Sequence, residues 1–165
     1  MKKILVIGCP GSGKSTLSER LAKALDLELI HLDRINWIDD NHTLNRADFD
    51  EQLEKILLKD CWIIDGNYNR TLSRRLIAAD TVIWLDLPRI LCVYRILKRF
   101  IKGKILHNRT FGNPNKIEKD FLKFVWNFNK TNRPLILNAL KNSSDKRIII
   151  LKTSKEIKQI KTILT

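Results

Sequence analysis

Residues 8–15 of the chain read Gly8-Cys9-Pro10-Gly11-Ser12-Gly13-Lys14-Ser15. They match the pattern G-x-x-x-x-G-K-[ST] of a phosphate-binding loop, in which backbone N–H groups surround the phosphates of a nucleoside triphosphate. In this pattern Lys14 reaches the terminal phosphates and the hydroxyl of Ser15 binds Mg²⁺. The alternative interpretation is a glycine-rich turn that fits the pattern by chance.

The segments on either side of this loop favour a phosphate site over a chance turn. Residues 2–7 form a short apolar run that is typical of a buried parallel strand. After the loop, Leu17, Leu21 and Leu25 recur at helical spacing, so a helix is expected to begin there with the positive end of its dipole under the phosphates. The predicted nucleotide-binding residues of the loop are Gly8, Gly11, Ser12, Gly13, Lys14, Ser15 and Thr16.

Chain length and composition limit the classes of protein that need to be considered. At 165 residues the chain is long enough for one well-packed domain and too short for two of ordinary size, so residues 1–165 are expected to form a single domain. No apolar run approaches the ~18 residues that cross a bilayer, and a cytoplasmic location without membrane contact is expected. Cys9, Cys61 and Cys92 are odd in number and widely spaced, which indicates neither a disulfide framework nor a zinc site.

Four further apolar runs predict the rest of a sheet. They cover residues 27–32, 61–64, 81–85 and 147–151, and helical patterns separate them. Five strands alternating with helices predict a three-layer α/β fold with a five-stranded parallel sheet. Asp33, Asp65 and Asp86 follow three of these strands, so their side chains are expected at the one sheet edge where ligands bind in such folds.

Several polar residues indicate where the helices begin and end. Asn45 is the expected N-cap of a helix with Asp48 in its first turn, and Ser154 is the expected cap of the closing helix. The segment 34–43 is mixed and polar around Trp37, without a clear period. Pro134 is expected to end or kink the helix that precedes it.

Positive charge is concentrated in one part of the chain. Residues 89–133 contain 12 Lys or Arg against Glu118 and Asp120, so they carry +10 of the net charge of +13. A helix beginning at Arg89 is expected to carry a basic face. Residues 103–116 lack apolar periodicity and predict a loop or small lid, whereas the aromatic residues between 117 and 128 are expected to be core. The basic face consists of Arg95, Lys98, Arg99 and Lys102.

These features together suit phosphoryl transfer, which needs a clamped donor, an acceptor in line and positive charge near the transferring oxygens. Lys14, Mg²⁺ on Ser15 and the lid arginines would supply that charge. Asp33 is the best candidate for orienting or deprotonating an acceptor hydroxyl, and Asp65 for holding metal-bound water or the acceptor. The structural alternative for Asp33 and Asp65 is that each caps a following helix or turn; for Asp86 this alternative is stronger.

The sequence resembles the adenylate-kinase-like branch of phosphate-loop kinases, and within it the topology modulation (FlaR-related) proteins. The resemblance spans most of the chain. Its motifs are the loop at 8–15, His31-Leu32-Asp33 with Trp37, Trp62-Ile63-Ile64-Asp65-Gly66-Asn67-Tyr68, the segment 79–89, and Tyr94-Arg95 with Lys98-Arg99.

The resemblance implies a nucleotide-kinase-like fold with a small lid, a segment 33–60 on the acceptor side and a basic lid region at 95–133. It also implies that Asp33 and Asp65 hold the acceptor and Mg²⁺-bound water, and that Arg95 and Arg99 stack on adenine and reach the phosphates. A further arginine usually comes late in the chain, for which Arg109 and Arg133 are candidates.

Besides the nucleotide-binding residues, which are those of the loop and Arg95, the predicted site residues fall into three groups. The candidate catalytic residues are Lys14, Asp33, Arg95, Arg99 and Arg133. The candidate metal-binding residues are Ser15 and Asp65. The candidate substrate-binding residues are Asp33, Asp65, Asn67, Tyr68 and Arg70. Residues 65–70 differ from the Asp-Gly-Phe-Pro-Arg motif that true adenylate kinases have at this place.

Two functions are consistent with the sequence. The first is a kinase that transfers the terminal phosphoryl group of Mg·ATP to a small-molecule acceptor such as a nucleotide or nucleoside. The second is a nucleic-acid-associated ATPase or regulator of DNA topology, which the basic stretch at 89–133 would suit. No helix-turn-helix, basic zipper or RNA-binding motif is visible. The kinase is favoured because the basic face coincides with the predicted lid helix.

Overall fold

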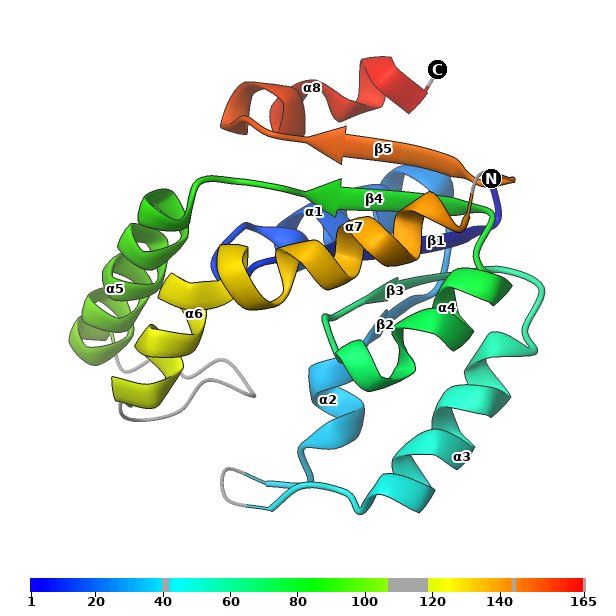
Figure 1. The fold of residues 1–165 in the computed structure, drawn as a ribbon, viewed down its shortest axis with the longest axis horizontal. Coiled ribbons are helices and arrows are strands. Elements are labelled where there is room, and N and C mark those ends of the chain that lie inside the picture. The colour runs from blue at the N-terminus through cyan, green and yellow to red at the C-terminus, as the bar shows by residue number, and fades with distance from the viewer. Residues whose placement is uncertain (40–41, 107–118, 144, 165) are drawn as a thin grey trace.

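A five-stranded parallel sheet lies at the centre of the computed structural model (Figure 1). The structure describes residues 1–39, 42–106, 119–143 and 145–164. The strand order β2-β3-β1-β4-β5 places the first strand in the middle, and helices cover both faces of the sheet, as in doubly wound α/β folds. The strands are β1 (Lys3–Gly8), β2 (Leu29–His31), β3 (Trp62–Asp65), β4 (Thr81–Leu85) and β5 (Arg147–Leu151).

The strand sequences explain why the sheet is parallel and central. β1, β3 and β4 are apolar runs, and nearly all of their residues are buried, as expected for strands covered by helices on both faces. In the register, Val6 pairs with Asp65 and Gly8 with Leu85. The phosphate loop and the end of β3 therefore emerge at the same edge of the sheet.

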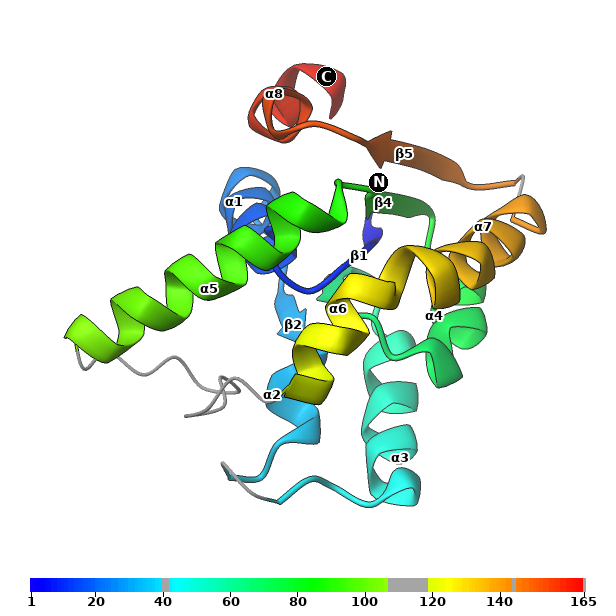
Figure 2. The same ribbon diagram turned by 60° about the vertical axis from the view of Figure 1, so that its left-hand side comes forward.

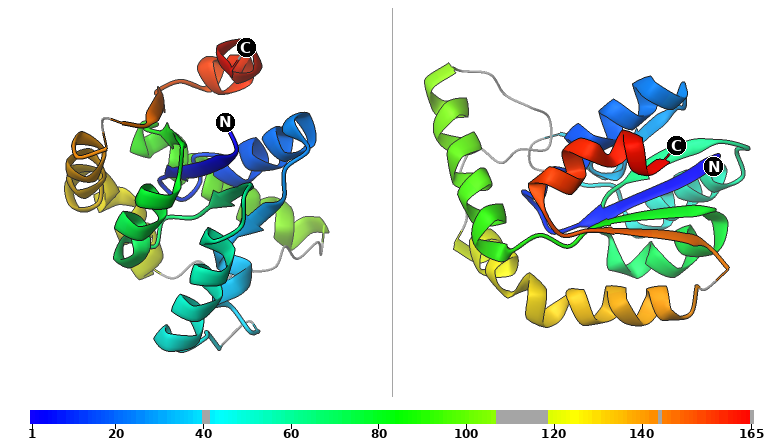
Figure 3. Two further views of the ribbon diagram at one scale, coloured as in Figure 1. Left: turned by 90° about the vertical axis from the view of Figure 1, so that its right-hand side faces the viewer. Right: turned by 90° about the horizontal axis from the view of Figure 1, so that it is seen from above.

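Helices cover both faces of this sheet. On one face, α1 and α8 pack against the side chains of Ile4, Val6 and Ile63. On the other face, α3, α4, α5, α6 and α7 contribute to a larger core that contains Trp62 and Trp84 (Figure 3). The helices are α1 (Lys14–Leu25), α2 (Leu32–Asn36), α3 (Arg46–Leu57), α4 (Leu72–Ala78), α5 (Arg89–Leu106), α6 (Lys119–Thr131), α7 (Arg133–Lys141) and α8 (Ser154–Leu164), with a short 3₁₀ turn at Asn69–Thr71.

Two helices frame the end of the sheet that carries the phosphate loop. Figure 2 shows α5 extending away from the end of β4, with α6 packed beside it. This arrangement brings the basic α5 over the loop that follows β1. The described part of the chain contains no helix long and apolar enough to cross a membrane.

The predicted fold class is confirmed, and three boundaries differ from the prediction. β2 ends at His31, because Leu32 already begins α2. The cap of α8 is Thr153, whose hydroxyl accepts the Glu156 N–H at 3.2 Å, so the expectation of a Ser154 cap is wrong. α5 continues to Leu106, and the rest of the predicted lid at 107–116 lies outside the described residues.

Other boundaries agree with the sequence. Asn45 caps α3, accepting the Asp48 N–H at 2.9 Å. Pro134 occupies the first turn of α7, after α6 has ended at Thr131, which is where proline is tolerated in a helix.

Candidate functional site

The loop between β1 and α1 has the backbone conformation that its glycines permit. Gly11 (φ +80°) and Gly13 (φ +98°) lie in the left-handed region that side chains disfavour. A Cβ at Gly11 would collide with the carbonyl oxygen of Cys92 and lie 2.9 Å from Ile96, both on α5. The loop is therefore pressed against the first turns of α5.

The N-terminus of α1 opens directly into this loop. Gly13 is its N-cap, no side chain caps the first turn, and that turn contains no acidic residue. Unpaired N–H groups and the helix dipole make such an end attractive to an anion.

Lys14 lies half-buried across the loop, with its Nζ donating to the Cys9 carbonyl at 3.2 Å. Burial lowers the pKa of Lys14, while the carboxylates of Asp65 and Asp33 act in the opposite direction. A bound phosphate would add another negative charge beside Nζ and favour its protonated form.

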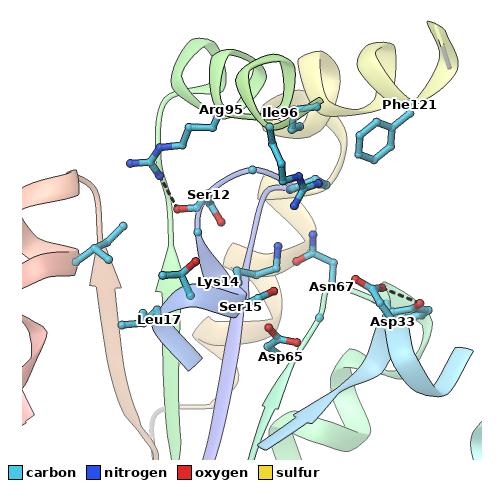
Figure 4. A pocket seen from close by; sticks show the side chains of 18 of the residues that line it. Ser12, Lys14, Ser15, Leu17, Asp33, Asp65, Asn67, Arg95, Ile96 and Phe121 are labelled. Atoms are coloured by element: carbon cyan, nitrogen blue, oxygen red, sulfur yellow. Dashed lines mark hydrogen bonds between the residues drawn. The ribbon is translucent and has the colours of Figure 1, made fainter. Parts of the chain in front are cut away.

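Two carboxylates follow neighbouring strands on the other side of the loop (Figure 4). Asp65, at the end of β3, is 4% exposed, and its Oδ1 accepts a hydrogen bond from His31 Nδ1 at 2.9 Å. Its Oδ2 is buried without a hydrogen-bond partner among the described residues. Asp33 lies on α2, and its Oδ1 accepts the hydroxyl of Tyr68 at 2.9 Å.

The segment after β3 connects these carboxylates to the phosphate loop. Asn67 Oδ1 accepts the Gly8 N–H at 3.1 Å. Burial raises the pKa of the Tyr68 hydroxyl, and the charge of Asp33 raises it further, so this hydroxyl stays protonated and donates to Asp33.

Arg75 on α4 holds this segment in place. The side chain is fully buried and donates to the carbonyl oxygens of Gly66, Asn67 and Tyr68 at 2.9, 2.7 and 2.8 Å. Burial lowers its pKa to about 10, so the guanidinium is still charged at neutral pH. Tyr68 has a positive φ of 20°, a conformation that needs such support from its surroundings.

The two predicted lid arginines reach the cavity from α5. Arg95 donates to the Ser12 carbonyl at 2.8 Å and to the Ser154 hydroxyl at 2.9 Å, joining the loop to α8. Burial lowers the pKa of Arg99, whereas the charge of Asp33 raises it. Both arginines line the same cavity, of about 830 Å³.

This cavity brings most of the predicted site residues together. It lies along the sheet edge, from Ser154 past the phosphate loop to Asp33. The predicted residues that line it are Gly11, Ser12, Gly13, Lys14, Ser15, Thr16, Asp33, Asp65, Asn67, Tyr68, Arg95 and Arg99. Gly8 lies next to it, through its hydrogen bond to Asn67.

Two predicted arginines lie elsewhere. Arg133 forms a two-nitrogen ion pair with Asp86 and lines a separate, shallower pocket with it. Arg70 is held by both carboxylate oxygens of Asp50, each at 2.7 Å, and does not line the cavity. A third candidate, Arg109, lies outside the described residues.

Sequence reasoning missed part of the cavity wall. The helical spacing of Phe121 and Phe124 predicts core residues, and Ser154 is predicted as a helix cap, yet all three line the cavity. Nothing in the sequence distinguishes the buried Arg75 from the exposed Arg74 beside it. The further lining residues that were not predicted are Pro10, Leu17, Arg20, Trp37, Asp39, Gly66, Ile96, Ile157 and Lys158.

The fold and the loop define a P-loop protein with the architecture of small kinases. A family model described as an AAA domain matches residues 4–110, well over half of the chain, and the chain belongs to this family. The search of curated proteins found no match.

Three solved structures with a similar fold are described as kinases. A candidate kinase from Chloroflexus aurantiacus J-10-fl is 21% identical, with a TM-score of 0.59, and the match covers 98% of this chain and 95% of that one. Shikimate kinase from Acinetobacter baumannii, in complex with shikimate, is 16% identical, with a TM-score of 0.66 and coverage of 99% and 93%. Shikimate kinase from Bacteroides thetaiotaomicron is 15% identical, with a TM-score of 0.62 and coverage of 98% and 96%.

Proposed function

We propose that the protein transfers the terminal phosphoryl group of Mg·ATP to a hydroxyl group of a small-molecule acceptor. The observation that carries this proposal is that a phosphate loop, two carboxylates and two arginines line one cavity. Phosphoryl transfer requires mainly positioning and charge neutralisation, and these residue types supply both. The similarity in fold to small kinases supports the same conclusion.

Donor and acceptor would occupy opposite ends of the cavity. Ser154, Ile157 and Arg95 lie towards α8, where the nucleoside part of the donor would fit. Asp33 and Tyr68 lie beyond the phosphate loop, beside β2 and β3. The γ-phosphate would then lie between the two ends, next to Lys14.

The residues fit a Mg²⁺ ion held between protein and phosphates. Asp65 offers a buried carboxylate oxygen that has no hydrogen-bond partner in the described part of the chain, and the exposed Ser15 lines the same cavity. The described residues contain no group of three or more His, Cys, Asp or Glu side chains that could hold a metal. Mg²⁺ does not need one, because it usually keeps water and binds one or two side chains plus phosphate oxygens. When bound there, it would neutralise phosphate charge.

The remaining chemistry would be carried out by side chains. Lys14 and Arg99 would stabilise charge on the transferring oxygens. The acceptor oxygen would form a bond to the γ-phosphorus, the bond to the bridging oxygen would break, and its electron pair would leave with ADP. Asp33, whose Oδ1 is already hydrogen-bonded to Tyr68, would accept the hydroxyl proton on Oδ2.

The nucleic-acid hypothesis has weaker support. Tyr94 and Trp126 are exposed next to Lys98 and Arg89, as stacking residues on a nucleic-acid surface would be. Other cations of the basic stretch line the cavity, as Arg95 does.

The more specific resemblance to topology modulation proteins and the cytoplasmic location stay predictions.

The test is ADP release from Mg·ATP with a panel of nucleosides, nucleotides, small hydroxy acids and DNA. Product is identified by mass spectrometry, and the Lys14→Ala variant serves as the blank. Acceptor-dependent ADP with a phosphorylated product is expected. ADP release stimulated by DNA alone, without a phosphorylated product, would contradict the kinase and favour the nucleic-acid ATPase.

A further inference from the structure

We propose that the acceptor is an uncharged hydroxyl compound with a flat ring, of which nucleosides are examples, and that it carries no phosphate or carboxylate group. This inference rests on the proposed kinase function and narrows its substrate class. It follows from the charges and the aromatic side chains at the end of the cavity beyond the phosphate loop. That end, the acceptor end, is lined by Asp33, Trp37, Asp39, Tyr68, Arg99 and Phe121.

The carboxylates at the acceptor end disfavour an anionic acceptor. Asp33 receives a hydrogen bond from the uncharged Tyr68 hydroxyl, so that contact leaves its negative charge in place. Asp39 adds a second carboxylate at the rim, where its Oδ2 lies 2.7 Å from His42 Nδ1. A second phosphate or a carboxylate would meet like charges here, which is a strong means of rejecting a wrong ligand.

The nearby arginines are bound to other groups. Arg70 and Arg74 both pair with Asp50, and Arg74 also contacts Glu54 at 3.3 Å. Arg75 is buried against three carbonyl oxygens. None of the three lines the cavity.

One arginine of the described residues remains at the acceptor end. Arg99 comes from α5. Burial lowers its pKa, and the negative charge of Asp33 acts in the opposite direction. The positive charge of Arg99 is needed by the transferring phosphoryl group, because the oxygens of that group are negatively charged. Within the described part of the chain, no second arginine or lysine at this end is left to bind an anionic group of the acceptor.

Aromatic side chains supply the surface for a ring. Tyr68 stacks on Phe49, with ring centroids 5.2 Å apart, and its hydroxyl donates to Asp33, so its ring is held in place before any acceptor binds. Trp37 is half-buried and lines the same end. Figure 4 draws Phe121 and Asp33 on the same side of the phosphate loop. A flat ring can stack among these side chains while its hydroxyl reaches Asp33.

The reaction balances with such an acceptor. Its hydroxyl oxygen bonds to the γ-phosphorus, the bond from that phosphorus to the bridging oxygen breaks, and ADP takes the electron pair. The proton passes to Asp33 and then to solvent. The product is a phosphate monoester, whose new charge next to Asp33 and Asp39 favours its release.

The test compares nucleosides with their own 5′-monophosphates as acceptors, with shikimate as a carboxylated ring compound. The readouts are ADP release and the mass of the product. At least one nucleoside is expected to be phosphorylated with a kcat/KM at least about tenfold above that of its monophosphate. A monophosphate or shikimate that is the better acceptor would overturn the inference and leave the kinase intact. ATP hydrolysis without any phosphorylated product would overturn the kinase itself.

Reversing the charge of Asp39 tests whether the carboxylates at the acceptor end exclude anionic acceptors. Asp39→Arg places a cation at the acceptor end, and Asp145→Arg makes the same change at the exposed turn before β5. The preference for nucleoside over monophosphate is expected to fall at least about fivefold in Asp39→Arg and to stay unchanged in Asp145→Arg. Equal preferences in the two variants would show that the local carboxylates do not exclude anions, and the inference would be wrong.

Discussion

The Asn67 side-chain oxygen accepts the Gly8 backbone N–H at 3.1 Å, and this contact joins the end of β3 to the start of the phosphate loop. Its neighbour Tyr68 donates to Asp33. The segment after β3 therefore contacts the phosphate loop on one side and the candidate general base on the other. A change in this segment is expected to affect both ends of the cavity.

Asn67→Ala is expected to weaken ATP binding. Without the amide oxygen, the Gly8 N–H loses its partner and the loop loses one restraint. A neutral hydrogen bond contributes about 0.5–1.5 kcal/mol, so the Kd for ATP should rise about two- to tenfold. Isothermal titration calorimetry measures it, with Asn129→Ala on α6, outside the cavity, as the matched control. An unchanged Kd in Asn67→Ala would contradict a role for this contact.

Arg75→Met is expected to be far more destabilising than Arg74→Met. The substitution leaves three carbonyl oxygens without the buried guanidinium, and each unpaired buried group costs about 1–3 kcal/mol. Arg74 is 49% exposed and forms surface ion pairs worth at most about 1 kcal/mol. Urea unfolding should show a loss of several kcal/mol for the first variant and little for the second. Similar losses would mean that Arg75 does not hold the segment.

Substitutions of Arg95 and Arg99 are expected to affect different steps, namely ATP binding for Arg95 and phosphoryl transfer for Arg99. Arg95 bridges Ser12 and Ser154, so Arg95→Ala should raise the Kd for ATP about tenfold or more. Arg99→Ala should leave the Kd for ATP nearly unchanged and lower kcat about 10²- to 10³-fold, because its charge is needed mainly in the transition state. Lys98→Ala, exposed on the same helix, is the control. The assignment would be wrong if Arg99→Ala lost ATP affinity and turnover equally.

The fold was predictable because its three central strands, β1, β3 and β4, are buried on both faces. Such strands appear as continuous apolar runs, and the loop at 8–15 fixes the position of the first crossover. The boundary at Leu32 was not predictable, since an apolar run shows burial and not the residue at which a strand becomes a helix. The polar character of 34–43 likewise concealed the short helix α2.

The positions of the candidate site residues were predictable where the backbone alone determines them. Asp65 stands at the end of a strand, so topology alone brings it to the loop. Ser154 and Phe121 come from elements far along the chain, and only the packing of α8 and α6 brings them to the cavity. The position of Arg133 depends on a long side chain that pairs with Asp86, which spacing along the sequence does not reveal.

The hydrogen bond between His31 and Asp65 is expected to make the free energy of unfolding of the protein depend on pH. This hydrogen bond raises the pKa of His31 above the ordinary value of 6.5, against the opposing effect of burial. A raised folded-state pKa stabilises the fold fully below pH ~6.5, and that contribution is lost as the pH rises through the folded-state value. His31→Gln should therefore be less stable than the parent at pH 5.5, and the difference should shrink as the pH is raised to 9. Urea unfolding across this range measures it, and His42→Gln, whose imidazole is 73% exposed, is the control. A difference that does not change with pH would mean that His31 is not protonated beside Asp65, and that this carboxylate faces the cavity without a cationic neighbour in His31.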